Sequence, residues 1–126
     1  MKQRFVINTK MPTLNEMIRR DRTNRYAGAE LKKRYQLYVS ACIRQAKLTP
    51  VKQAQWILYE YHESSKRRDK DNVSAFARKV INDALQTTGI IPKDNNEWVA
   101  GLSEVFVYDK TDKIIVTLVD HIAEEE

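Results

Sequence analysis

The segment KQAQWILYEYHES, residues 52–64, is rich in aromatic and β-branched side chains and alternates between two faces. One face carries Gln55, Ile57, Tyr59 and Tyr61, and the other carries Trp56, Leu58, Glu60 and His62. A period of two with this composition predicts a β-strand, and we expect it in the centre of a sheet. Other segments of the chain must then form the strands that pair with it on both sides.

The other apolar patterns predict three helices and three further strands. Residues 3–9 alternate and predict a first strand, and Thr13 followed by Glu16 is the capping-box pattern of a short helix. Residues 29–46 and 72–88 have apolar stripes at helical spacing, and Gly89 is a C-terminal stop for the second. Residues 101–121 are two alternating runs around DKTD, which predict a β-hairpin.

The predicted order is therefore strand, helix, helix, strand, helix, hairpin. This order is typical of an α+β fold in which a mixed β-sheet has helices packed on it. A chain of 126 residues can bury a core of its own, so residues 1–126 are expected to form a single domain. Its content of 42% hydrophobic and 31% charged residues is that of an ordinary globular protein.

Two features of the composition bear on where the protein works. The chain has one cysteine, Cys42, which makes no internal disulfide and therefore fits a reducing compartment. It has no apolar run of about 18 residues, which argues against a membrane span. A soluble, cytoplasmic protein with no membrane partner is expected.

Positive charge is concentrated in one part of the chain. The net charge is +5, from 22 Lys and Arg against 17 Asp and Glu, and residues 19–47 hold nine basic side chains against two acidic ones. The nine are Arg19, Arg20, Arg22, Arg25, Lys32, Lys33, Arg34, Arg44 and Lys47. A basic face suits a polyanion, most often nucleic acid, and a solvated helical surface explains the same charges equally well.

The segment KRRDKDN, residues 66–72, sets Asp69 and Asp71 in a basic cluster between the central strand and the helix that follows. If this junction is extended, residues two apart project to the same side and their carboxylates share one ligand. A third acid, Asp94, follows the helix in the loop GIIPKDNNEW, and its distance from the pair is open. Three carboxylates beside a basic surface would suit Mg²⁺ or Mn²⁺ bound together with a phosphate.

Each acid also has a purely structural explanation. Asp71 can cap the following helix, and Asp94 can be a turn residue. Asp83 can form an exposed ion pair with Lys79, four residues earlier. These explanations stay open beside the metal-site hypothesis.

Other common chemistries are disfavoured. His62 and His121 have no Cys or His at zinc-ligand spacing. The chain has neither a Gly-rich phosphate loop nor a nucleophile elbow, which argues against a P-loop nucleotide hydrolase and a serine hydrolase.

The combination of RRDKDN, a helix that ends in DAL and the following GIIPKD resembles the RusA-type Holliday-junction resolvases, small endodeoxyribonucleases of bacteria and their phages. The segment MPTLNE after the first strand is similar to the family's Pro-rich opening, so the resemblance covers most of the chain. It is most specific in residues 67–94.

The resemblance implies a homodimer that binds four-way DNA junctions and nicks two opposed strands. It implies Mg²⁺ as the cofactor, with Mn²⁺ as a substitute, and attack of a metal-activated water on the phosphodiester. The corresponding role would be in DNA recombination and repair or in phage DNA processing.

The family's essential aspartates map onto Asp69, Asp71 and Asp94, which the resemblance makes the catalytic and metal-binding residues. Its functional lysine maps onto Lys79 when counted back from the DAL helix end, and onto Ala75 when counted forward from Asp71. Lys79 is preferred because alanine supplies no charge.

Residues around the acids are assigned to DNA contact. Arg67, Arg68 and Asn72 flank the motif, and Asn72 either orients the metal site or is simply the first polar residue of the helix. Contact with the DNA backbone is assigned to Arg19, Arg20, Arg22, Arg25, Lys32 and Lys33. Lys93 stands where other members can carry an acid, which leaves the third ligand to Asp94, with Glu97 as the alternative.

Two other functions fit the same residues. A non-catalytic DNA-binding protein would use the same basic surface, with the aspartates serving as caps and turns. A protein-interaction module would use the acidic EEE tail and an amphipathic helix. Metal-dependent cleavage of DNA distinguishes a nuclease from both.

Overall fold

The structure is a computed structural model that describes residues 1–23, 27–66, 68 and 70–121. Within these ranges, side chains are described for all residues except Met17, Arg20, Asp21, Arg22, Thr23, Asp71 and Asn72. The described elements are β1 (Lys2–Ile7), α1 (Leu14–Thr23), α2 (Ala27–Gln45), β2 (Gln55–Glu63), α3 (Lys70–Thr87), β3 (Val99–Tyr108) and β4 (Lys113–Asp120). The predicted class, an α+β fold with a mixed sheet and helices, is confirmed.

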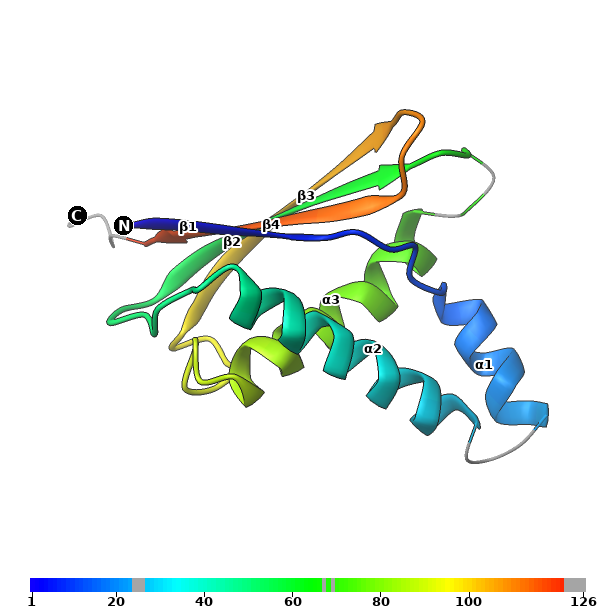
Figure 1. The fold of residues 1–126 in the computed structure, drawn as a ribbon, viewed down its shortest axis with the longest axis horizontal. Coiled ribbons are helices and arrows are strands. Elements are labelled where there is room, and N and C mark those ends of the chain that lie inside the picture. The colour runs from blue at the N-terminus through cyan, green and yellow to red at the C-terminus, as the bar shows by residue number, and fades with distance from the viewer. Residues whose placement is uncertain (24–26, 67, 69, 122–126) are drawn as a thin grey trace.

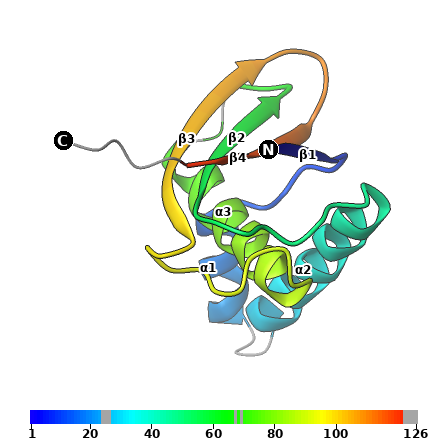
Figure 2. The ribbon, with the colours of Figure 1, turned by 90° about the vertical axis from the view of Figure 1, so that its left-hand side faces the viewer.

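The sheet has four strands in the order β1-β4-β2-β3. β2 pairs in parallel with β3 and antiparallel with β4, and β1 pairs antiparallel with β4. All three helices cover one face of this sheet (Figure 1 and Figure 2). The expectation that residues 52–64 form a central strand is confirmed, because β2 has a neighbour on each side.

The prediction of a hairpin in residues 101–121 is wrong. Both strands exist, but β2 lies between them, so β3 and β4 are not paired with each other. β2, α3 and β3 form a crossover unit, which makes β3 parallel to β2 and leaves the other side of β2 to β4. Adjacency in sequence favoured the hairpin, but the helical crossover decided the pairing.

The turn from β3 to β4 passes over the end of β2 and is bound to it. Asp109 Oδ2 lies 2.8 Å from His62 Nδ1, and the backbone N–H of Ser64 donates to Asp112 Oδ1 at 2.9 Å. The hydrogen bond with His62 is the largest cause that lowers the pKa of Asp109 to about 2. These contacts fix the loop beside the junction that leads from β2 to α3.

The core lies between the sheet and the helices. β2 contributes Ile57, Tyr59 and Tyr61, all almost fully buried, and they face the predicted stripe of α3. That stripe is buried as expected at Val73, Phe76, Ala77, Val80, Ala84 and Leu85. On α2 the prediction holds less well, because Tyr38 is exposed. None of the described helices is both long and apolar enough to cross a membrane.

The predicted helix signals are present at both ends. The backbone N–H of Glu16 donates to Thr13 Oγ1 at 3.2 Å, as the capping pattern requires. After α3, Gly89 has a positive φ of 79°, the backbone conformation that terminates many helices and that glycine adopts without strain.

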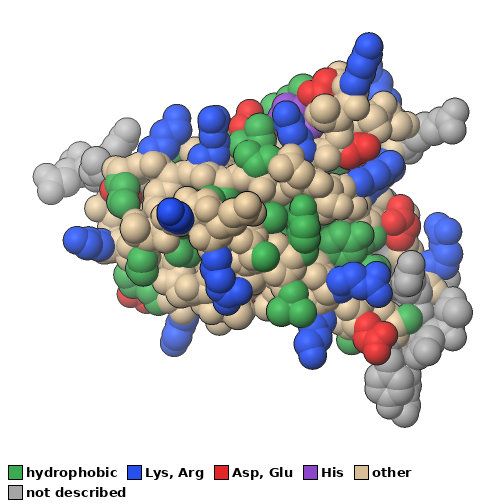
Figure 3. All heavy atoms as spheres, in the orientation of Figure 1, with side chains coloured by type: hydrophobic (Ala, Val, Ile, Leu, Met, Phe, Trp, Pro, Cys, Tyr) green, Lys and Arg blue, Asp and Glu red, His purple; other side chains and the backbone are tan. Residues whose placement is uncertain are grey.

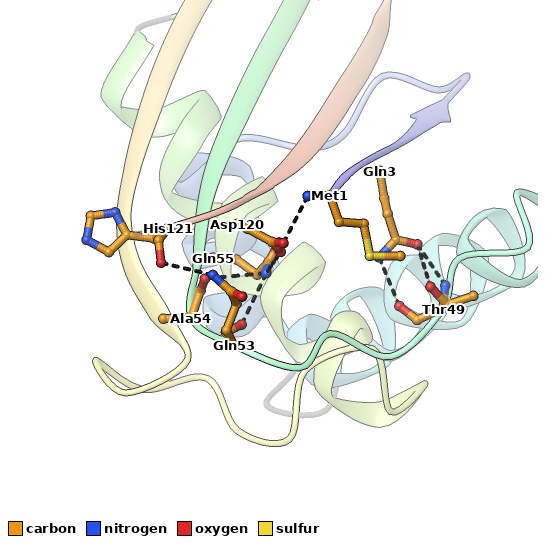
Figure 4. A network of polar contacts seen from close by, with 8 residues as sticks. All are labelled: Met1, Gln3, Thr49, Gln53, Ala54, Gln55, Asp120 and His121. Atoms are coloured by element: carbon orange, nitrogen blue, oxygen red, sulfur yellow. Dashed lines mark hydrogen bonds and ion pairs between the residues drawn. The ribbon is translucent and has the colours of Figure 1, made fainter. Parts of the chain in front are cut away.

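The end of the sheet far from the acidic motif is closed by a polar network (Figure 4). Gln55 is buried, and its Nε2 donates to Asp120 Oδ1 at 2.8 Å, while Asp120 Oδ2 lies 2.9 Å from the terminal amine of Met1. The amide of Gln3 bonds to Thr49 in the loop before β2. These contacts tie the edge strand β1 to β2 and β4.

Candidate functional site

The acidic motif lies at the junction between β2 and α3. β2 ends at Glu63 and α3 begins at Lys70, so Asp71 is the second residue of the helix. The condition of an extended junction therefore fails at Asp71. Arg67 and Asp69 lie outside the described residues, as do the side chains of Asp71 and Asn72, and their assigned roles stay predictions.

Arg68 is turned toward the protein interior. Its Nη1 lies 3.4 Å from Glu63 Oε1, and its Nη2 donates to the backbone carbonyl of Met11. The side chains of Arg68 and Glu63 are only 12% and 8% exposed. Its guanidinium is therefore engaged by internal partners and anchors the junction to the end of β2 and to the loop after β1, and the contact of Arg68 with a DNA phosphate stays a prediction.

Glu63 gives this anchor a pH dependence. Burial raises the pKa of the Glu63 carboxyl above its ordinary value, and Arg68 opposes that shift without cancelling it. An acid whose pKa is raised by folding binds its proton more tightly in the folded state, so its contribution to stability falls as pH rises above the ordinary value of 4.5.

We expect Glu63→Gln to remove this part of the pH dependence. Relative to wild type, the variant should lose less unfolding free energy as pH rises from about 4.5 toward neutral, because glutamine does not ionise. Urea unfolding at several pH values measures the difference, with Glu60→Gln on the opposite face of β2 as the control. Parallel curves for wild type and Glu63→Gln would contradict the assignment.

Several lysines surround the start of α3. Lys10 and Lys113 line a surface hollow together with Glu63 and Arg68. On the β3 side, Lys66 Nζ lies 5.3 Å from the ring centre of Tyr108, and Lys70 Nζ lies 5.6 Å from that of Phe106. Aromatic faces hold cations in place while leaving their charge available. The end of the sheet that bears the motif thus carries four lysines, together with the acids Glu63, Asp109 and Asp112.

Asp94 lies elsewhere, beside the second half of α3. Its Oδ1 accepts a hydrogen bond from Asn82 Nδ2 at 3.4 Å, and its backbone N–H donates to Gln86 Oε1 at 3.0 Å. Asn82 follows Asp71 by eleven residues on the same helix, which is about 16 Å along the axis. Asp94 is therefore not beside Asp71 within one chain.

The cause of this separation is the length of α3 and the shortness of the loop that follows it. α3 ends at Thr87, seven residues before Asp94, and the chain between them packs back only as far as Gln86 and Asn82. The Asn82 amide also accepts a hydrogen bond from the buried Tyr59 hydroxyl. Asp94 is thus part of a polar network with the core, and its role as a metal ligand stays a prediction that one chain does not satisfy by itself.

Lys79 and Lys32 both form an ion pair with the same acid, Asp83. Lys79 Nζ lies 3.3 Å from Asp83 Oδ1, and Lys32 Nζ, from α2, lies 3.2 Å from Asp83 Oδ2. The expected exposed ion pair between Lys79 and Asp83 is present. Lys79 follows Asp71 by eight residues, about 12 Å along the helix, so it lies two turns away from the acidic motif.

The remaining predicted DNA contacts are spread over α1 and α2. Arg19 and Lys33 are exposed, while the side chains of Arg20 and Arg22 and the whole of Arg25 lie outside the described residues. On the face shown in Figure 3, the described Lys and Arg side chains lie both in the middle and around the outline and form no single patch. A single basic face over residues 19–47 therefore stays a prediction.

Sequence reasoning missed the residues that build the junction. Glu63 continues the inward-facing series of β2, where an acid requires a buried partner, and three cations, Lys66, Arg67 and Arg68, follow it within five residues. The position of Glu63 on the buried face of β2 was therefore a signal that could have been used. Lys10, Lys66, Lys70 and Lys113 had no such signal, because their grouping depends on the folded sheet.

Among the described residues, no group of three or more His, Cys, Asp or Glu side chains is arranged to hold a metal ion. The side chains of Asp69 and Asp71 lie outside the described residues and are not covered by this statement. No protein-family model matches the chain, and no curated protein matches it.

Proposed function

We propose that this protein is a Mg²⁺-dependent endodeoxyribonuclease of the RusA type that nicks four-way DNA junctions. The observation that carries the proposal is the setting of the acidic motif. Asp71 stands in the first turn of α3, and Lys10 and Lys113 on one side and Lys66 and Lys70 on the other lie at the same end of the sheet. Acids near several cations at the end of a sheet suit a metal ion and a phosphate together.

The donor set fits Mg²⁺. This ion prefers oxygen ligands and is often held by one or two carboxylates, with water and a substrate phosphate completing its shell. Asp69 and Asp71 would hold it, and neither Asp94 nor a nitrogen or sulfur donor is needed for that. When bound, the ion polarises the phosphodiester and stabilises the leaving oxygen.

The chain's own residues prepare this site. The ion pair of Arg68 with Glu63 fixes the start of α3 against the end of β2, which holds the motif in place. The surrounding lysines attract the DNA backbone and offset the repulsion between its phosphates and the two aspartates. Binding then depends on the lysines and cutting on the acids.

One observation favours the alternative of a non-catalytic DNA-binding protein. Asp94 is engaged in hydrogen bonds with Asn82 and Gln86, as a purely structural loop residue would be. That function predicts DNA binding without any metal-dependent product. Metal-dependent cleavage of DNA therefore distinguishes the two functions.

The test is cleavage of a labelled four-way junction and a matched linear duplex, each with Mg²⁺ and with EDTA. Paired nicks in the junction, absent from the duplex and lost with EDTA, are expected. Tight binding with no product in Mg²⁺ or Mn²⁺ would identify the protein as the non-catalytic alternative.

The four lysines near the start of α3 lead to a separate prediction about DNA binding. Replacing Lys10 and Lys66 with Gln should weaken DNA binding and lower the slope of log K against log salt by about 1.5 to 2, because two phosphate contacts are lost. The matched control replaces Lys2 and Lys52, exposed lysines near the other end of the sheet, and should leave the slope unchanged. Fluorescence anisotropy at a series of salt concentrations gives both slopes, and equal loss in the two variants would contradict a localised binding site.

A further inference from the structure

The face of the sheet opposite the helices carries exposed apolar side chains. All three described helices lie on the other face (Figure 1). Side chains that alternate with the core residues of β2 point to this open face, and the strand register places those of the neighbouring strands beside them. Val6, Trp56, Val105 and Val119 are each between 38% and 44% exposed. The outer face of a sheet is usually polar, so an apolar one suits a binding partner.

Trp56 is fixed against this face. Its six-membered ring lies over Gly101 of β3, where a Cβ atom would overlap it. Its Nε1 donates to Ser103 Oγ at 2.9 Å, so the polar group of the indole has a partner within the sheet. Trp56 is nevertheless 40% exposed. An aromatic ring held in this way is a platform on which a planar group can stack.

Positive charge borders the platform. Lys2 and Trp56 pair with the same residue of β4, Val119, from opposite sides, and Arg4 follows two residues along β1. Because neighbouring strands are about 4.8 Å apart, the Cα atoms of Lys2 and Trp56 are about 10 Å apart. Lys2 and Arg4 are both exposed. The edge strand thus runs beside the aromatic ring as a row of cations.

The other charges of the described strands on this face keep it positive. Lys113 of β4 lies at the far end of the face, in register with His62. Glu60 of β2 is the acid between them and Trp56. Three lysine and arginine side chains therefore stand against one carboxylate, which favours an anionic partner.

We propose that this face binds single-stranded DNA, with bases stacked on Trp56 and the sugar-phosphate backbone along Lys2 and Arg4. Unpaired bases offer flat apolar faces, and phosphates offer the opposite charge to the row of cations. An apolar protein partner would instead bury Lys2 and Arg4, at a cost that the phosphates of a strand avoid. Paired DNA has its bases stacked inside the duplex, so it does not use this platform.

The site is separate from the acidic motif. Trp56 is near the start of β2, and the motif follows the end of the strand at Glu63, about 23 Å away. Binding to the platform therefore requires neither Mg²⁺ nor the aspartates. A fully paired junction offers no free base, so Lys2 remains a valid control for the lysines near the start of α3.

The fluorescence of Trp56 tests the proposal directly. The chain has two tryptophans, so Trp98→Phe leaves Trp56 as the reporter. In EDTA, an oligothymidylate of about 16 nucleotides should quench the emission of Trp56, and a duplex of the same length should not. The absence of quenching by the single strand, or equal quenching by both, would overturn the proposal.

Two variants measure the parts of the site by anisotropy of the labelled oligothymidylate. Trp56→Ala should weaken binding by about 5- to 150-fold, the loss that corresponds to one stacked base. Because Trp56 also packs on Gly101 and its loss can disturb the sheet, Arg4→Gln gives an independent measure. It should lower the slope of log K against log salt by about 0.7, while Arg44→Gln, an exposed control on α2, should leave it unchanged. Equal slopes for the two variants would overturn the proposal.

Acrylamide quenching of the DNA-free protein distinguishes a free face from a covered one. Trp56 should be accessible to acrylamide at every protein concentration. If Trp56 is shielded in concentrated protein and becomes accessible on about 100-fold dilution, another copy of the chain covers this face and the proposal is overturned. None of these measurements depends on cutting, so failure of the nuclease proposal leaves their result unchanged.

Discussion

Asp71→Asn is expected to abolish cutting of a four-way junction while leaving DNA binding equal or tighter. Asparagine keeps the shape of the side chain but removes the negative charge that would hold Mg²⁺, so the rate should fall at least about 100-fold. The same change removes repulsion between the site and the phosphates, which is why binding should not weaken. Cleavage in Mg²⁺ and binding in EDTA, measured on the same labelled junction, give the two quantities separately.

The matched control is Asp120→Asn at the far end of the sheet (Figure 4). Asp120 accepts a hydrogen bond from Gln55, which an asparagine oxygen still accepts, and its ion pair with the terminal amine of Met1 is exposed, so the fold and the cutting rate should change little. If Asp71→Asn cuts as fast as this control, Asp71 serves only the start of α3, where a negative charge is favourable in any helix.

Local periodicity was sufficient to predict the elements and most of the core. The alternation around Tyr59 and the stripe that contains Val80 depend only on neighbouring residues, and both are buried as expected. The pairing of strands was not predictable in the same way. β3 and β4 are adjacent in sequence, yet each pairs with β2, because the crossover through α3 fixes β3 parallel to it.

In the candidate site, too, local patterns predict some positions, and others depend on contacts between distant parts of the chain. The position of Asp71 between β2 and α3 follows from the two patterns that flank it, although Asp71 is already helical and not in an extended junction. The position of Asp94 depends on how far the chain packs back along α3, and Asn82 and Gln86 bind it before it reaches the motif. Arg68 was assigned to DNA because it flanks the motif, whereas its partners in the structure come from β2 and from a loop near residue 11.

Arg68→Ala is expected to destabilise the protein by about 3–5 kcal/mol, because it leaves the buried carboxylate of Glu63 without its cation and the carbonyl of Met11 without its donor. The loss should shrink at acidic pH, since the pKa of Glu63 is raised by burial and a protonated Glu63 needs no cation. Urea unfolding at neutral and acidic pH measures both effects.

Two comparisons make the result specific to the buried pair. Lys79→Ala removes an exposed ion pair with Asp83 and should change stability by no more than about 0.5 kcal/mol. Glu63→Gln combined with Arg68→Ala should recover part of the stability lost in Arg68→Ala, because no unpaired charge remains buried. A stable Arg68→Ala protein that binds DNA more weakly would instead mean that the guanidinium leaves Glu63 to contact phosphate, and the anchoring role would be wrong.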